Sequence, residues 1–323
     1  MNKKISNKKT VLELCAGGGG QFIGLEQAGF SCIGAVEIEA NYCNTLLLNR
    51  PDLNVINGDL KTFSANKYAK VDLIAGGVPC PPFSIAGKQL GQNDERDLFP
   101  ATLRIISEAA PRAILIENVP GFASRKFENY RNSIQQSLGM LGYWTDWTIL
   151  HAHNFGTPQL RSRFVLVGFS KGIEKYFEWP SGSNKIVNVG ELIEDLMSSN
   201  GWPGAKKWAL NAVGAGPTLV GGSTKHGGPD LGPTRAKMQW QKLGVDGRGI
   251  ADDSPTSDFP INGQPKLTVR MAARIQGFPD NWKFFGRKTT AYRQIGNAFP
   301  PPVAKAVALQ IIRALEQYDK KRV

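Results

Sequence analysis

Two continuous apolar runs constrain the fold of this chain more than any other feature of its sequence. They read VDLIAGGV (71–78) and AILIENV (113–119), and neither alternates between apolar and polar side chains. Such runs are typical of parallel strands that are buried on both faces of a sheet. From residue 10 to about residue 170, segments with strand and helix character alternate. This alternation predicts a doubly wound α/β fold with a mostly parallel sheet, whose ligands lie beyond the carboxyl ends of the strands.

The chain changes character after about residue 180, which predicts a second, smaller domain. Residues 201–250 hold 12 of the 36 glycines and seven Lys or Arg against two Asp or Glu. We expect loops and short strands with a basic face there, the alternative being a low-complexity linker. The three tryptophans in this stretch favour an ordered structure; they are Trp202, Trp208 and Trp240.

The last part of the chain has the spacing of an amphipathic helix. Residues 301–321 carry Val303, Val307, Ile311 and Leu315 at intervals of four. Such a helix needs a large apolar surface, so we expect it to return to the first domain and to make the second domain an insertion.

Charge and cysteine content indicate the class of partner and the compartment. A net charge of +12 and a pI near 9.5 favour a polyanionic partner, most commonly nucleic acid, although a merely basic protein remains the alternative. The chain has four cysteines without a C-x-x-C pair and three histidines, which argues against a metal site. The unpaired cysteines also suit a reducing cytoplasm. The sequence shows neither a signal peptide nor ~18 consecutive apolar residues, so we expect a soluble cytoplasmic protein outside the membrane.

A glycine turn and two acids follow the first three predicted strands. Gly17, Gly19 and Gly24 stand between the first strand and a helix, where backbone can approach an anionic ligand closely. Glu37 ends the second strand and suits ribose hydroxyls, and Asp59 follows the third and suits an adenine amino group. Together these residues indicate an adenosine-type ligand without saying which, since dinucleotide sites share the glycine turn. A tight turn with surface acids is the alternative.

Candidate catalytic residues follow the next strands at the same edge of the sheet. Cys80 is enclosed by prolines, which suit an exposed nucleophile better than a buried core cysteine. Glu117 ends an apolar strand, where burial raises a carboxyl pKa, although helix capping or a salt bridge is the alternative. Arg161 and Arg163 alternate along the predicted strand of QLRSRFVLVG and can face one pocket, which suits the binding of an anion or carbonyl.

Eight motifs in order resemble those of the C5-cytosine-specific DNA methyltransferases, from about residue 10 to residue 310. They are LCAGGGGQFIGLEQAGF (14–30), VEIE (36–39), GD (58–59), PCPPFSIAGKQ (79–89), ENV (117–119), QLRSRFVLVG (159–168), LTVRMAARIQGFPD (267–280) and YRQIGNAFPPPVA (292–304).

The resemblance implies an enzyme that transfers a methyl group from S-adenosylmethionine to C5 of a cytosine flipped out of a short duplex DNA site. It implies Cys80 as nucleophile on C6, Glu117 at N3 and the exocyclic amine, and Arg161 and Arg163 on the base and flanking phosphate, without a metal. The cofactor-binding residues that it implies are Leu14, Cys15, Gly17, Gly19, Glu37, Ile38, Asp59, Leu98 and Asn297.

The resemblance also implies the domain organisation and the DNA contacts. Residues 1–182 form the catalytic and cofactor-binding domain, 183–288 the target-recognition domain, and 289–323 a segment that returns to the catalytic domain. The candidate DNA-binding residues are Ser84, Lys88, Gln89, Lys225, Arg235 and Arg248, with His226 and Lys237 as further candidates by charge. Arg270 and Arg274 are expected chiefly to pack the variable domain onto the catalytic one, with phosphate binding as the alternative.

The sequence departs from the common family pattern at several positions. Glu13 and Cys15 replace the usual acid and aromatic residue of the first motif, Pro81 replaces a glutamine after the nucleophile, and Leu160 replaces a basic residue. Cys15 cannot stack on adenine as a phenyl ring does.

We expect a monomeric enzyme of restriction–modification type, with a cognate endonuclease that acts on the same site without forming a stable complex. A tRNA cytosine-5 methyltransferase of the same fold and a catalytically silent DNA-binding protein are the alternatives. A nicotinamide-dependent dehydrogenase shares the glycine turn but does not require Cys80, Glu117 and the two arginines.

Overall fold

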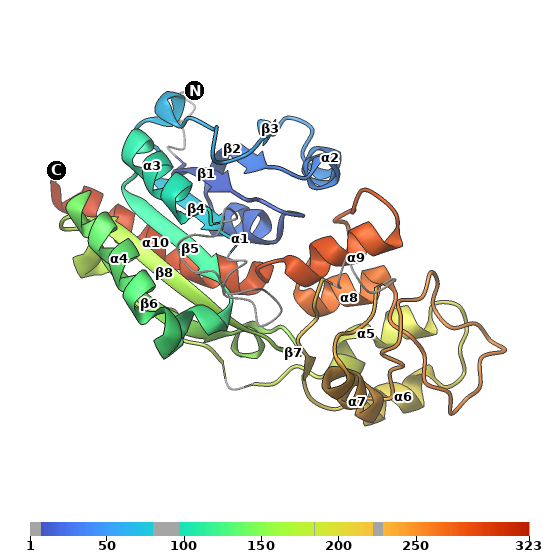
Figure 1. The fold of residues 1–323 in the computed structure, drawn as a ribbon. Coiled ribbons are helices and arrows are strands. Elements are labelled where there is room, and N and C mark those ends of the chain that lie inside the picture. Colours follow the sequence, from blue (N-terminus) through green and yellow to red (C-terminus); the bar gives the residue numbers. More distant parts are fainter. Residues whose placement is uncertain (1–7, 80–96, 184, 222–228, 323) are drawn as a thin grey trace, which may run out of the picture.

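The chain forms one seven-stranded sheet that is covered by helices on both faces (Figure 1). The computed structural model describes residues 8–79, 97–183, 185–221 and 229–322. In spatial order the strands are β3 (Val55–Asn57), β2 (Ser31–Glu37), β1 (Thr10–Leu14), β4 (Leu73–Gly77), β5 (Ala113–Asn118), β8 (Ser162–Ser170) and β6 (Tyr143–His151). Only β8 runs antiparallel to its neighbours, and every other adjacent pair is parallel. The predicted doubly wound, mostly parallel α/β fold is confirmed.

Strand order reverses between β1 and β4, which fixes the place where a ligand can enter. From β1 the chain moves outward to β2 and β3, and then crosses back to β4 and β5 on the other side. Connections that leave in opposite directions open a crevice beyond the carboxyl ends of β1 and β4. The glycine turn and the segment that leads to residue 79 both begin at this crevice.

The two faces of the sheet bury alternate residues of the same strands. Val11 and Leu73 pack with one helical layer, whereas their chain neighbours Leu12 and Ile74 pack with the other. The first layer contains α1 (Gly20–Ala28) and α10 (Pro301–Arg322), and the second contains α3 (Phe99–Ala109) and α4 (Glu128–Met140). α2 (Ala40–Asn49) follows β2. Single 3₁₀ turns lie at Asn66–Tyr68, Pro120–Ala123, Arg125–Phe127, Ala152–Phe155 and Glu174–Tyr176.

The C-terminal helix returns to the sheet as its apolar spacing predicts. The side chains of Val303, Val307, Ile311 and Leu315 are all buried, and α10 packs along α1. After residues 183–288, the chain therefore returns to the helical layer that contains α1. The domain boundaries at residues 182 and 288 stay predictions.

The excursion between β8 and α10 is more helical than expected (Figure 1). It contains α5 (Val189–Ser198), α6 (Ala205–Asn211), α7 (Thr234–Lys242) and α8 (Val269–Gln276), and α9 (Lys288–Asn297) follows it. The described strands there are limited to the two residues of β9 (Gly216–Pro217), which pair with β7 (Gln159–Leu160). The prediction of loops and short strands was wrong because α6 and α7 are too short to display a helical repeat. Each is anchored instead by one buried tryptophan, Trp208 or Trp240.

The buried Arg161 guanidinium joins three segments that are distant in sequence. Arg161 is 1% exposed and stands between β7 and β8. It donates to the carbonyl of Leu219 at 2.7 Å, and to those of Gly296 at 3.0 Å and Ala298 at 2.9 Å. Hydrogen bonds from a charged donor are the strongest kind in proteins, so this residue ties the variable segment and the returning segment to the sheet.

Arg161→Met should lower the free energy of unfolding by roughly 3 kcal/mol, because three buried carbonyls lose a charged donor. Arg235→Met provides the matched control, since Arg235 is exposed on α7, and its effect should stay within about 0.5 kcal/mol. Urea denaturation followed by tryptophan fluorescence measures both values. An unchanged midpoint in Arg161→Met would show that the three contacts do not stabilise the fold.

Candidate active site

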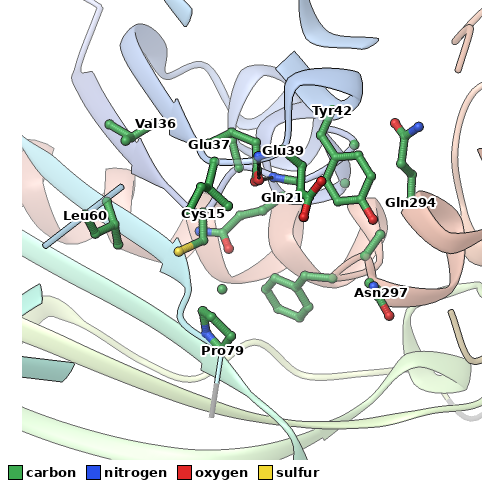
Figure 2. A pocket seen from close by; sticks show the side chains of 18 of the residues that line it. Cys15, Gln21, Val36, Glu37, Glu39, Tyr42, Leu60, Pro79, Gln294 and Asn297 are labelled. Carbon is green, nitrogen blue, oxygen red and sulfur yellow. Dashed lines mark hydrogen bonds between the residues drawn. The ribbon is translucent and has the colours of Figure 1, made fainter. Parts of the chain in front are cut away.

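A cavity of about 430 Å³ lies at the carboxyl ends of the central strands (Figure 2). Its volume is in the range of sites that enclose a small molecule. It is lined by Cys15, Ala16, Gly17, Gly18, Gly20, Gln21, Val36, Glu37, Ile38, Glu39, Tyr42, Gly58, Asp59, Leu60, Gly77, Pro79, Leu98, Glu117, Arg293, Gln294, Asn297, Ala298 and Phe299. The cavity thus combines the ends of β1, β2, β4 and β5 with the segment that returns before α10.

The glycine turn after β1 forms one wall through a left-handed backbone. Cys15, Gly17 and Gly19 have φ values of 52°, 58° and 91°. Such values suit glycine, but for a cysteine they are uncommon and strained. The Gly17 amide donates to the Glu37 carboxylate at 2.7 Å, which fixes the turn against the end of β2.

Trp282 holds the same turn from the side of the variable segment. Its indole Nε1 donates to the Gly18 carbonyl at 3.0 Å. A Cβ on Gly19 would lie 2.5 Å from the Trp282 ring, and a Cβ on Gly20 would lie 2.5 Å from the Phe299 carbonyl oxygen. Glycine is therefore required at both positions for close packing, in addition to the φ requirement at Gly19.

Two buried acids lie beneath the turn. The Glu37 carboxylate also accepts from the Glu39 amide at 2.9 Å, and burial raises its pKa despite these backbone donors. Glu13, on β1, is 1% exposed. Its Oε2 has no hydrogen-bond partner within the part of the chain that the structure describes. Burial, with the charge of Glu37 nearby, raises the pKa of Glu13 well above its ordinary value.

Glu117 and Arg163 form an ion pair at the edge of the cavity. Glu117 is the penultimate residue of β5, and the Arg163 Nε lies 2.6 Å from its Oε1. Burial raises the pKa of Glu117, while the positive charges of Arg163 and Arg161 oppose that shift. A carboxyl in this state can hold a proton close to neutrality and give it to a nitrogen base.

The neighbouring strand end is held by the residue after Glu117. The Asn118 side chain donates to the Val78 carbonyl at 3.1 Å. This contact fixes the backbone one residue before Pro79, which lines the cavity. Cys80 comes next in sequence but lies outside the described residues.

The comparisons with known proteins agree with this geometry. A family model described as C-5 cytosine-specific DNA methylase matches residues 9–313. The chain belongs to this family.

Two bacterial relatives are similar in sequence over nearly the whole chain. The Type II methyltransferase M.NgoMIV of Neisseria gonorrhoeae is 52% identical over 95% of this chain and 98% of its own length. The Type II methyltransferase M.NaeI of Lentzea aerocolonigenes is 50% identical over 97% of this chain and 76% of its own. This protein is accordingly a DNA (cytosine-5)-methyltransferase of the Type II restriction–modification group.

Solved structures show the same fold at low sequence identity. The Entamoeba histolytica methyltransferase EhMeth matches with a TM-score of 0.68 at 15% identity, over 96% of this chain and 99% of that one. The S. pombe Dnmt2 methyltransferase matches with a TM-score of 0.61 at 22% identity, over 95% and 98% of the two chains.

The family and the fold imply S-adenosylmethionine as methyl donor of this methyltransferase, and the residues of the cavity suit it. Carboxylates at the ends of β2 and β3 can accept from hydroxyl and amino groups, whereas Ile38, Leu60 and Leu98 offer apolar contact to a flat base.

The structure gathers most predicted cofactor residues of the methyltransferase around the cavity. Cys15, Gly17, Glu37, Ile38, Asp59, Leu98 and Asn297 all line it. Leu14 and Gly19 do not: Leu14 is fully buried in the sheet, and Gly19 packs on Trp282. Arg161 and Arg163 also lie outside the lining: Arg161, between β7 and β8, bonds to the Gly296 and Ala298 carbonyls, whereas Arg163 on β8 pairs with Glu117. The catalytic and cofactor roles of all these residues stay predictions.

Several lining residues escaped the sequence analysis. Gln21, Tyr42, Arg293, Gln294 and Phe299 all line the cavity. Burial raises the pKa of Tyr42 to about 12, so its hydroxyl remains neutral at physiological pH. Tyr42 lies on α2, where no motif marks it. Arg293, Gln294 and Phe299 stand in the motif at 292–304 and Gln21 in the motif at 14–30, but the sequence analysis did not single them out.

The candidate DNA-contacting residues of the methyltransferase are only partly described. Ser84, Lys88, Gln89, Lys225 and His226 lie outside the described residues. Arg235 is exposed on α7, Arg248 pairs with Asp246 at 2.9 Å, and Lys237 pairs with Asp230 at 2.6 Å.

The contacts described for Arg270 and Arg274 all lie within residues 183–288, so their expected role in packing the two domains together stays a prediction. Arg270 donates to the Trp282 carbonyl at 2.6 Å. Arg274 pairs with Asp195 and Asp280.

Two further observations concern metal ions and membranes. Among the described ranges, no three His, Cys, Asp or Glu side chains gather as a metal ion would need. Nor does any helix in those ranges have the length and apolar character to cross a membrane.

Glu13→Gln should make the stability of the methyltransferase less sensitive to pH. Because the folded-state pKa of Glu13 is raised, the folded protein holds a proton that the unfolded chain releases above pH ~4.5. The contribution of Glu13 is therefore present below that pH and is lost as pH rises toward the folded-state pKa. Within this window the wild-type free energy of unfolding should fall more steeply, by up to about 1.4 kcal/mol per pH unit, than that of Glu13→Gln.

Denaturation curves measured between pH 5 and 8 provide the comparison. Glu128→Gln on the exposed start of α4 is the control and should keep the wild-type slope. Equal slopes in the wild type and Glu13→Gln would contradict a raised pKa at Glu13.

Proposed function

We propose that this methyltransferase acts on a cytosine that is turned out of a short, specific duplex site, and that Cys80 bonds transiently to C6 of that base. The observation that carries the proposal is the Glu117–Arg163 pair, which lies at the cavity edge beside the strand that leads through Pro79 to Cys80. A buried carboxyl pairs naturally with a cytosine edge, which presents an acceptor at N3 next to an amino donor. A base can reach this position only outside the double helix.

The proposed chemistry needs a nucleophile, an acid and a base-binding cation. The Cys80 thiolate adds to C6, and Glu117 supplies a proton to N3 and accepts from the exocyclic amine, so that the electron pair gathers at C5. Arg163 keeps Glu117 oriented and contacts the base. S-adenosylmethionine, when bound, supplies a methyl group made electrophilic by its sulfonium. After C5 has gained the methyl group and S-adenosylhomocysteine is left, loss of the C5 proton lets that electron pair restore the 5,6 double bond and expel the Cys80 thiolate, while N3 returns its proton to Glu117.

For the cofactor we assign the two acids that follow β2 and β3. Glu37 accepts from the ribose hydroxyls, and Asp59 accepts from the adenine amino group. Cys15, Ile38 and Leu98 contact the adenine, and Asn297 closes the site from the returning segment. The cavity lining supports this assignment. Because Cys15 replaces an aromatic residue, the adenine is held by smaller contacts on that side.

DNA is proposed to bind along the basic surface between the sheet and residues 183–288. A net charge of +12 favours contact with phosphates, and Arg235, Arg248, Lys88 and Lys225 are the proposed donors, with Ser84 and Gln89 from the segment after Cys80. We further infer a monomer and a cognate endonuclease that recognises the same site without a stable complex. The names of the Type II relatives support the inference of a cognate endonuclease.

Covalent trapping on duplex DNA that carries 5-fluorocytosine tests the proposal. Fluorine cannot leave as a proton does, so the Cys80 adduct should accumulate with the wild type and be absent with Cys80→Ser. Cys32→Ser is the matched control, because Cys32 lies outside the cavity lining, and it should still form the adduct. Denaturing electrophoresis separates adduct from free protein.

The same assay tests the role of Glu117. Glu117→Gln should slow adduct formation by about 10²–10⁴-fold, because the proton for N3 is lost. The exposed control Glu128→Gln should react at the wild-type rate. Adduct formation by Cys80→Ser, or at the wild-type rate by Glu117→Gln, would overturn the proposed mechanism.

A further inference from the structure

The proposed cofactor contacts leave the buried side chain of Gln21, unpaired within the described part of the chain, without a role. Gln21 is 4% exposed and lies in the first turn of α1, directly after the glycine turn. Its Nε2 and Oε1 atoms are both inaccessible to solvent, and neither has a hydrogen-bond partner among residues 8–79, 97–183, 185–221 and 229–322. Buried amides are normally paired, and an unpaired one in a native protein requires an explanation.

The position of Gln21 points to a ligand as that explanation. The residue lines the cavity, and its side chain lies in the cluster shown in Figure 2. The N-cap residue of α1, Gly19, has no side chain to cap the helix, although the Phe22 backbone N–H donates to the Glu13 carboxyl. A helix N-terminus favours negative charge, whereas the Gln21 carbonyl oxygen favours a donor. The two together suit a group that carries both an anion and a donor.

The residues proposed to bind the adenosine lie on the wall of the cavity opposite Gln21. The space beside Gln21 is therefore free for another part of S-adenosylmethionine. Ile38, Asp59 and Leu60 stand on the side of β2 and β3, where the adenosine is proposed to bind. Glu117 and Pro79 mark the end where the methyl group must be delivered. In S-adenosylmethionine the sulfur joins the adenosine to an α-amino acid, so the amino-acid part must extend along the remaining wall. That wall is formed by the start of α1 and by Ala298 and Phe299, whose backbone packs on Gly20.

We propose that Gln21 binds the α-amino-acid part of S-adenosylmethionine, with Nε2 donating to its carboxylate and Oε1 accepting from its ammonium group. A primary amide carries one donor group and one acceptor, which matches this zwitterion. The assignment rests on the proposed use of S-adenosylmethionine and adds Gln21 to the residues that select the ligand. It predicts that Gln21 distinguishes ligands with the amino-acid part from ligands without it.

Calorimetric titration with two ligands tests this assignment without any catalytic turnover. S-adenosylhomocysteine has the amino-acid part, and 5′-methylthioadenosine has the same adenosine and sulfur without it. Gln21→Leu should weaken S-adenosylhomocysteine about tenfold or more, because two buried hydrogen bonds are lost, and should change 5′-methylthioadenosine less than twofold. Gln21→Glu should weaken S-adenosylhomocysteine further, since its carboxylate meets a like charge.

Two controls separate a ligand contact from a packing effect. Gln135→Leu on α4 removes a partly buried amide that bonds to Thr145, far from the cavity lining, and should leave both affinities unchanged. Gln21→Leu should not lower the melting temperature of the ligand-free protein, because its amide loses no protein partner; Gln21→Met serves as a second variant should Leu disturb the fold.

Each result bears on the assignment. Selective loss of S-adenosylhomocysteine in Gln21→Leu or Gln21→Met supports it. Equal losses for both ligands, or no loss for either, would overturn it, although wild-type binding of S-adenosylhomocysteine would leave the proposed cofactor standing. Failure of the wild type to bind S-adenosylhomocysteine would instead refute the proposed cofactor and the Gln21 contact together.

Discussion

The cavity depends on one buried cation, the guanidinium of Arg161. By donating to the carbonyls of Leu219, Gly296 and Ala298, it fixes the variable segment and the returning segment against the same edge of the sheet. The returning segment then supplies a whole wall of the cavity, and its packing on Gly20 positions the start of α1. A site that unites the first 120 residues with the last 30 needs such a connection, since no local sequence can close it.

The second determinant is the burial of acids in a protein that is basic as a whole. The net charge of +12 suits the DNA surface, yet Glu13, Glu37 and Glu117 are all buried at strand ends near the cavity. Burial raises the pKa of each. Of these three acids only Glu117 has an arginine as direct partner among the described residues, whereas Glu37 accepts from the Gly17 amide of the glycine turn.

The sequence was sufficient to predict the sheet, because apolar runs such as those at 71–78 and 113–119 reflect burial on both faces, here by the two helical layers. It also placed Glu37, Asp59 and Glu117 correctly, since parallel strands bring their carboxyl ends to one edge. It failed for α6 and α7, which are short helices that each bury a tryptophan. It missed Tyr42 because its approach to the cavity is set by tertiary packing, and it did not single out Gln294 within its motif. For Arg161 and Arg163, alternation suggested a shared pocket, but neither lines the cavity and their hydrogen-bond partners differ.

The central claim is that this chemistry serves duplex DNA, and methyl transfer from tritiated S-adenosylmethionine measures it most directly. Equal concentrations of unmethylated duplex DNA and of tRNA should be offered to the full-length protein. The account predicts that label enters the DNA alone and resides on C5 of cytosine at one recurring short sequence. Label in tRNA alone, or no transfer to either substrate by protein that binds S-adenosylhomocysteine, would contradict it.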